Sequence, residues 1–140
     1  MILAVYSGQT VRISYINTDE KRRQNMPFIN VHIGKPISED KKEEVMKAIA
    51  SHMTIIPGKT IDNTMIEISA GRDMFMGGEK RDLIYVDMKV NGPAPTESKD
   101  EFVKALVADF EKILDIPGKN FYMSIAEMTG WGVGAGYKGK

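Results

Sequence analysis

The sequence predicts one α/β domain, in which two β-α-β repeats form a four-stranded sheet with both helices on one face. The first observation is an internal repeat: Pro57-Gly58-Lys59 recurs sixty positions later as Pro117-Gly118-Lys119, and the same offset carries Glu67 onto Glu127. The second is that each half follows a strand–helix–strand pattern. The third is that 140 residues, 42% of them hydrophobic, suffice for one buried core. Because a crossover helix joins parallel strands, each half gives a parallel pair.

The first half begins with a strand and continues into a helix. Phe28–Ile33 alternates apolar and polar residues, as a strand with one buried face does. Gly34-Lys35-Pro36 ends the strand because its proline lacks the N–H that a sheet ladder needs, and Ser38 then caps a helix. Apolar residues recur along this helix at helical spacing: Val45, Met46, Ile49, Ala50 and Met53. Pro57-Gly58 ends the helix, and Thr64–Ser69 is the second strand.

The second half repeats this order. Leu83–Val90 alternates strictly, and Ser98–Glu101 ("SKDE") has the spacing of a capping box at the start of a helix. The apolar stripe of that helix comprises Phe102, Val103, Leu106, Val107, Phe110, Ile113 and Leu114. Phe121–Met128 is the last strand, and the glycine-rich tail "TGWGVGAGYKGK" has room for a short edge strand.

No segment of the chain remains to cover the second face of this sheet. The side chains expected there are a mixture of aromatic and polar groups: Asn30, His32, Tyr85, Tyr122 and Ser124. We infer that this face meets other subunits.

The first residues have no partner in the repeat. We therefore expect residues 1–26 to be an extension, either a wrongly assigned translation start or a leader, and residues 27–140 to be the domain, with repeats at about 27–78 and 79–140. Lys21-Arg22-Arg23 can be encoded by purine-rich codons that resemble a bacterial ribosome-binding site, which favours a start at Met26. If the extension is retained, Val11–Ile16 alternates well enough to form an added strand on the sheet edge or on a neighbour.

The composition argues against several classes of function. Lys and Arg number 19, as do Asp and Glu, so no long-range field attracts nucleic acid or an anionic membrane. No apolar run approaches the ~20 residues of a membrane span, and the N-terminus is a poor secretory signal. We expect a cytoplasmic protein, with secretion without a signal peptide left open. With no cysteine, and with His32 and His52 outside any ligand spacing, we expect neither metal nor cofactor.

Four features in order resemble the tautomerase superfamily, specifically its long members related to macrophage migration inhibitory factor and phenylpyruvate tautomerase. Met26-Pro27 opens an alternating strand, and "IPGK" at 56–59 follows the first helix. "MFMGG" at 74–78 precedes the third strand, and the last strand, "FYMSIAEMTGWG", ends in an acidic residue and a Trp-Gly pair. The resemblance covers Pro27–Gly136. It implies a symmetric homotrimer around a central channel and keto–enol tautomerisation by an N-terminal proline, exposed when the initiator methionine is removed.

The resemblance implies that Pro27 is the catalytic base and that Lys59 lies near it. A free α-amine has a pKa of about 7.7–8.0, close to neutrality, and burial beside a cation lowers it further. Lys59 can also hold a substrate carboxylate, or it can be a plain helix C-terminal cation like Lys119. Candidates for the apolar surroundings are Phe28, Met74, Phe75 and Trp131.

The remaining site residues come from the last two predicted strands. Tyr122 matches the tyrosine that a neighbouring subunit contributes to the pocket in this family. Ser124 stands where the mammalian proteins have an asparagine, which alters that hydrogen bond. Val90 or Asn91 falls at the pocket-lining end of the third strand. The mammalian Cys-x-x-Cys is replaced by "LIYV", so no residues remain for thiol-redox activity.

The sequence thus predicts an enzyme, a tautomerase that acts on a small α-keto acid such as phenylpyruvate, with Pro27 as general base after removal of Met26. Two alternatives stay open. If the extension is retained, Pro27 is an amide without a basic lone pair, and the protein is a non-catalytic trimeric binding or signalling protein of the same fold. The same proline could also isomerise or hydrate an unsaturated acid.

Overall fold

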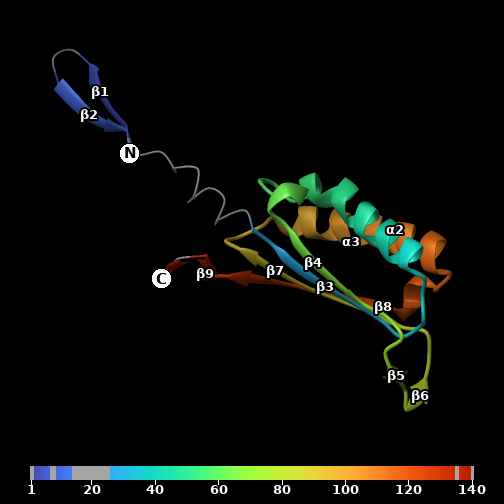
Figure 1. Cartoon of the computed structure of the whole chain (residues 1–140). Coiled ribbons are helices and arrows are strands. Elements are labelled where there is room, and N and C mark those ends of the chain that lie inside the picture. The colour runs from blue at the N-terminus through green and yellow to red at the C-terminus, as the bar shows by residue number, and fades with distance from the viewer. Residues whose placement is uncertain (1, 7–8, 14–25, 135, 140) are drawn as a thin grey trace.

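A four-stranded sheet covered on one side by two helices forms the body of the protein (Figure 1). A computed structural model describes residues 2–6, 9–13, 26–134 and 136–139. The strands lie in the order β4 (Met65–Ser69), β3 (Phe28–Ile33), β7 (Ile84–Asn91) and β8 (Phe121–Met128). The pairs β3–β4 and β7–β8 are parallel, while β3 and β7 are antiparallel. The two predicted β-α-β repeats are confirmed, with α2 (Glu39–His52) and α3 (Thr96–Leu114) as the crossovers.

The core lies between the sheet and the helices, because every second strand residue points toward the helices. The buried strand residues are Ile29, Val31, Ile33, Ile84, Val86, Met88, Val90 and Phe121. They meet Val45, Ala48 and Ile49 from α2 and Phe102, Leu106 and Phe110 from α3. Within the predicted stripe of α2, Met46 and Ala50 are only partly buried, and Ala48 packs in the core in addition.

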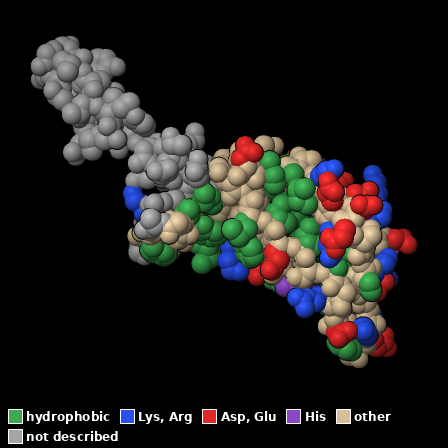
Figure 2. All heavy atoms as spheres, viewed as in Figure 1, with side chains coloured by type: hydrophobic (Ala, Val, Ile, Leu, Met, Phe, Trp, Pro, Cys, Tyr) green, Lys and Arg blue, Asp and Glu red, His purple; other side chains and the backbone are tan. Residues whose placement is uncertain are grey.

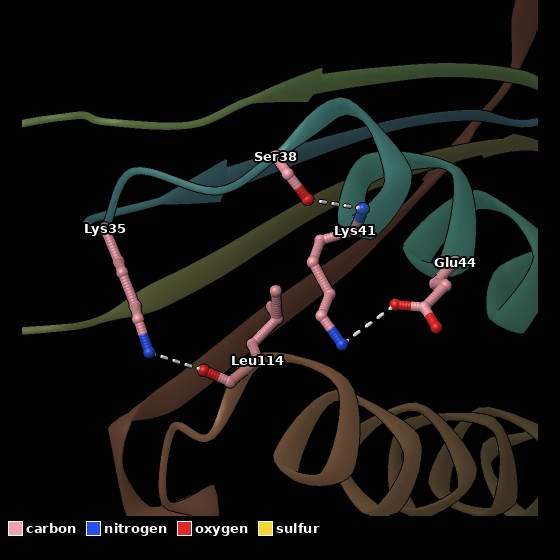
Figure 3. A network of polar contacts seen from close by, with 5 residues as sticks. All are labelled: Lys35, Ser38, Lys41, Glu44 and Leu114. Carbon is pink, nitrogen blue, oxygen red and sulfur yellow. Dashed lines mark hydrogen bonds and ion pairs between the residues drawn. The ribbon is translucent and has the colours of Figure 1, made fainter.

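The start of α2 agrees with the sequence. The hydroxyl of Ser38 accepts a hydrogen bond from the backbone N–H of Lys41 at 3.2 Å, as an N-cap does. Figure 3 shows that the Lys35 ammonium, just before this cap, donates to the Leu114 carbonyl at the last turn of α3 at 2.8 Å. The Lys41 side chain pairs with Glu44 on the helix surface at 3.1 Å. The turn before α2 is thus fastened to the end of the other helix.

The predicted capping box at Ser98–Glu101 is wrong. The N-cap of α3 is Pro95, three residues before Ser98, and the helix begins at Thr96. The Pro95 carbonyl accepts the first helical hydrogen bond from the Lys99 N–H at 3.1 Å. Ser98 therefore lies inside the first turn, where its backbone is helical and cannot adopt the extended conformation of a cap.

The repeat is real, but its offset differs between the strands and the PGK motif. Phe28 pairs with Met65 and Ile84 with Phe121, so the strands correspond at an offset of 56 positions. By this register Glu67 does not correspond to Glu127, because Glu127 lies near the end of the longer strand β8. The first half has a shorter helix than the second, 14 residues against 19, and a longer loop after its PGK motif. That loop contains the 3₁₀ turn η2 (Ile61–Asn63).

The remaining strands form three hairpins of their own. β1 (Ile2–Tyr6) pairs with β2 (Gln9–Ile13), so residues 11–13 of the predicted strand Val11–Ile16 pair with β1 and not with the sheet edge. Residues 14–16 and the Lys21-Arg22-Arg23 run lie outside the described residues. The predicted edge strand of the tail is also a hairpin, formed by β9 (Gly130–Val133) and β10 (Gly136–Gly139), and β5 (Phe75–Met76) pairs with β6 (Glu79–Lys80).

The helix layer carries charges of both signs. In Figure 2 acidic and basic side chains intermingle over this part of the surface and do not separate into a patch of one sign. His52, which lies outside any metal-ligand spacing in the sequence, is at the end of α2, where its Nε2 is 2.6 Å from Asp109 Oδ2 of α3. Within the described ranges, neither helix is long and apolar enough to cross a membrane.

Candidate active site at the Pro27 end of the sheet

Pro27 lies at one end of the central sheet, immediately before β3. The residue is buried, and its carbonyl accepts a hydrogen bond from the Met65 N–H of β4 at 3.0 Å. On the other side Phe28 is paired with Lys89, so the antiparallel register brings Pro27 beside Val90, near the end of β7. The strands on both sides therefore fix the position of this proline.

Lys59 reaches the same end of the sheet. Lys59 is 4% exposed, and it is the one charged residue that is buried among the described residues. Its Nζ donates to the Asn91 carbonyl at 3.2 Å, at the last residue of β7. Burial lowers the pKa of this amine below its ordinary value, because desolvation disfavours the charged form.

The two PGK lysines thus have different environments. Lys119, in the turn η3 (Gly118–Asn120), is exposed, as a solvated cation near a helix end would be. Lys59 follows the turn η1 (Met53–Ile55), and its N–H bonds to the Ile56 carbonyl at 3.1 Å, while its side chain turns inward. The reading of Lys59 as a plain helix C-terminal cation does not fit this burial.

Three further predicted residues lie at this end. The Val90 side chain is fully buried in the core, so at the end of β7 it is the Asn91 carbonyl that meets Lys59. Phe28 is half-buried on the uncovered face, next to Met65 in the register. Trp131 is half-buried in β9, three residues beyond Met128, which pairs with Asn91. Pro27, Lys59, Asn91, Phe28 and Trp131 therefore gather at one end of the sheet.

Tyr122 and Ser124 lie elsewhere in the same protomer. Tyr122 pairs with Tyr85, which pairs with His32, five residues along β3 from Pro27. At a rise of about 3.3 Å per residue this separation is roughly 17 Å. Tyr122 is 63% exposed on the uncovered face. A site that contains both Pro27 and Tyr122 therefore requires a second copy of the chain.

Met74 and Phe75 are not brought to Pro27 within one protomer either. The hairpin β5–β6 leaves the opposite end of the sheet, where the Arg72 N–H bonds to the Ile33 carbonyl at 3.1 Å. Phe75 is 63% exposed at this far end.

The sequence did not single out Glu127 as a site residue. Its Oε1 accepts hydrogen bonds from the Ala94 N–H at 3.1 Å and from the Lys99 ammonium at 2.6 Å. The bond from Lys99, followed by that from Ala94, lowers the pKa of this carboxyl group. Glu127 thereby fastens the loop after Asn91 to the start of α3. The sequence feature that could have identified Glu127 is an acidic residue at an inward position of the last strand, where it faces the N-terminus of a helix.

Metal ligands do not gather in the part of the chain that the structure describes: no group of three or more His, Cys, Asp or Glu side chains could hold an ion there. The cationic group at the Pro27 end is the Lys59 side chain, which donates to the Asn91 carbonyl.

Comparisons with known proteins agree on the fold. A scan of protein-family models and a search of curated proteins gave no match to this chain. Leishmania major MIF2 matches with a TM-score of 0.74 and 18% identity, over 81% of this chain and 98% of that chain. A macrophage migration inhibitory factor-like protein from Entamoeba histolytica matches with a TM-score of 0.72 and 21% identity, over 81% and 99%. A fused 4-OT asymmetric trimer matches with a TM-score of 0.70 and 14% identity, over 78% and 94%.

These matches cover nearly the full length of the known chains. The protein has the same fold as these structures, and the α/β fold predicted from its sequence is confirmed. The fold is the one found in homologues of macrophage migration inhibitory factor.

Proposed function

We propose that this protein is a keto–enol tautomerase that acts on a small α-keto acid such as phenylpyruvate, with Pro27 as general base when it is the first residue. The observation that carries the proposal is the buried ammonium of Lys59, held on the Asn91 carbonyl at the end of the sheet where Pro27 lies. A cation and a proline at one place are the two groups that a keto acid needs.

The proposed reaction moves one proton from carbon to oxygen. The free amine of Pro27 takes a proton from the carbon next to the carbonyl, and the protonated proline or water returns a proton to the carbonyl oxygen. The low pKa of an α-amine, lowered further by a nearby cation and by burial, leaves the amine largely unprotonated near neutral pH. Lys59 binds the substrate carboxylate as a point charge and stabilises the enolate-like transition state.

The proposal includes a homotrimer. Tyr122 and Ser124 are exposed on the uncovered sheet face, too far from Pro27 to serve the same protomer's site. A neighbouring copy would bring them to Pro27, and one structure with this fold is described as a trimer. The pocket then lies between subunits, with Phe28 and Trp131 as apolar walls beside the amine.

The extension decides whether this chemistry is available. With Met26 attached, the Pro27 nitrogen is an amide and cannot accept a proton from the substrate. The full chain would then be the non-catalytic binding protein considered above, and a chain beginning at Pro27 would be the enzyme.

The test compares three proteins: a chain beginning at Pro27, the full chain, and a chain in which Pro27→Ala provides a primary amine. Enol absorbance measures phenylpyruvate tautomerisation, and sedimentation measures the oligomer. We expect the chain that begins at Pro27 to be active and the full chain to be inactive. The Pro27→Ala chain, which also begins at residue 27, should lose activity by about 10²-fold or more. Both chains that begin at residue 27 should be trimers. Equal activity of the full chain and the Pro27 chain would refute the assignment of the base.

A further inference from the structure

Tyr85 holds the hydroxyl group of Ser124. Its phenol oxygen and the Ser124 Oγ are hydrogen-bonded partners across the neighbouring strands β7 and β8. The register pairs Tyr85 with Tyr122, and Ser124 with Asp87, so the bond runs diagonally to the next outward position. All these side chains lie on the face of the sheet away from the helices.

A second contact fixes the Tyr85 ring. His32, opposite it on β3, lies with its ring centroid 5.9 Å from that of Tyr85 and its plane inclined by 15°, which is a stacked arrangement. Tyr85 is half-buried between these neighbours, whereas Ser124 is exposed. The phenol oxygen therefore has a defined position, while the serine keeps one side open to a ligand.

We propose that Tyr85 is a positioning residue, which orients the Ser124 hydroxyl so that its proton points toward an oxygen of the keto acid in the neighbouring subunit's pocket. This inference rests on the proposed function, because it needs Ser124 to reach that pocket. A serine hydroxyl rotates freely and both donates and accepts hydrogen bonds. Either oxygen can donate in this pair, and because a phenol is more acidic than an alcohol we assign Tyr85 as the donor, which leaves the serine proton for the substrate.

This arrangement has a consequence for substrate choice. A hydroxyl that accepts a bond from Tyr85 becomes a better donor, because hydrogen bonds in a chain polarise one another. The pocket therefore favours keto acids that present an acceptor oxygen to Ser124. The tyrosine acts on binding through the serine and does not touch the reacting atoms.

The test uses the chain beginning at Pro27, with Tyr85→Phe, Ser124→Ala and the double variant. Phenylalanine keeps the ring on His32 and removes only the hydroxyl. Two readouts are taken: KM and kcat for phenylpyruvate, and its Kd from quenching of Trp131, the one tryptophan of the sequence. Ser51→Ala is the matched control, because it removes a hydroxyl that bonds to the Ala48 carbonyl on the helix side.

We expect each single variant to raise KM and Kd by about threefold to tenfold, with kcat little changed. The double variant should be no worse than Ser124→Ala, because the tyrosine acts only through the serine. Ser124→Thr, which keeps a hydroxyl, should restore binding, and Ser51→Ala should behave as the unchanged chain.

Multiplying effects in the double variant, or an unchanged KM and Kd in Tyr85→Phe, would overturn the role of Tyr85. Loss of the trimer in Tyr85→Phe would also overturn it, in favour of a purely structural role. A chain that binds phenylpyruvate without converting it would refute the proposed function, while the Kd values would still decide about Tyr85. A chain that does neither refutes both.

Discussion

A methionine in place of Lys59 replaces a buried cation by an apolar side chain of similar length. Two terms oppose each other in the folded state. The bond from Lys59 to the Asn91 carbonyl contributes about 1.5–3 kcal/mol, as hydrogen bonds from charged groups do. The burial of the ammonium, which leaves the residue 4% exposed, opposes folding by a similar or larger amount. At pH 7 we therefore expect the free energy of unfolding of Lys59→Met to equal that of the original protein or to exceed it by up to about 1 kcal/mol.

The activity of this variant should change in the opposite direction. The substrate carboxylate loses a charged partner worth about 1.5–3 kcal/mol, which corresponds to a fall in kcat/KM of about 10- to 100-fold. Removal of a positive charge near Pro27 also favours the protonated amine. The acid limb of the pH–rate profile should therefore move to higher pH.

The pH dependence of stability gives a further check. The pKa of Lys59 is lowered in the folded state, so the unfolded chain binds this proton more tightly. The resulting loss of stability is complete below the lowered pKa and disappears as the pH rises through the ordinary value of 10.5. Any stability advantage of Lys59→Met should be greatest at neutral pH and decline toward alkaline pH.

Urea unfolding across this pH range measures the stability, and phenylpyruvate turnover by the chain beginning at Pro27 measures the activity. Lys119→Met is the matched control, because it makes the same change at the exposed lysine of the other repeat. We expect it to alter neither quantity. A decrease of about 3 kcal/mol or more in the free energy of unfolding of Lys59→Met would contradict a net cost of burying this lysine. An activity loss in Lys119→Met as large as that in Lys59→Met would contradict a specific role of the buried lysine.

Substitutions at two further positions, Glu127 and Asp115, test the structure near the helix ends. Glu127→Gln should lower the melting temperature at pH 7, because it removes the charge that Lys99 and the Ala94 N–H stabilise. Since the folded pKa of Glu127 is lowered, its stabilisation is complete above the ordinary value of 4.5 and is lost as the pH falls through the folded value. Melting curves that still differ well below that pH would contradict this cause. Asp115, at the end of α3, has a φ of 54°, so Asp115→Gly should raise the free energy of unfolding by up to about 1 kcal/mol and Asp115→Ala should lower it. If Asp115→Ala melted at a higher temperature than Asp115→Gly, the left-handed backbone at this position would not be strained.

Strand and helix periods could be read from the sequence because they depend on local order. The strands Phe28–Ile33 and Phe121–Met128 have the predicted bounds, since alternation defines which side faces the core. The start of α3 was predicted at Ser98, because the capping-box spacing there competed with the true cap at Pro95. Ser98 and Pro95 are both possible N-caps and lie only three residues apart, and in the folded protein the helix begins after Pro95.

The candidate site depended more on tertiary structure. Lys59 and Lys119 share the same PGK motif, so local sequence cannot tell that one is buried and the other exposed. The longer loop in the first half and the distant carbonyl of Asn91 create that difference.

The sequence alone determined the repeats, the sheet with its two helices and the resemblance that pointed to Pro27. Only the tertiary structure decided that Lys59 is a desolvated amine at the Pro27 end, and that Tyr122 lies at the other end of the same sheet. The physical reason is that periodicity follows from neighbours along the chain. Burial and the distance between Pro27 and Tyr122 follow instead from strand register, which pairs residues far apart in sequence.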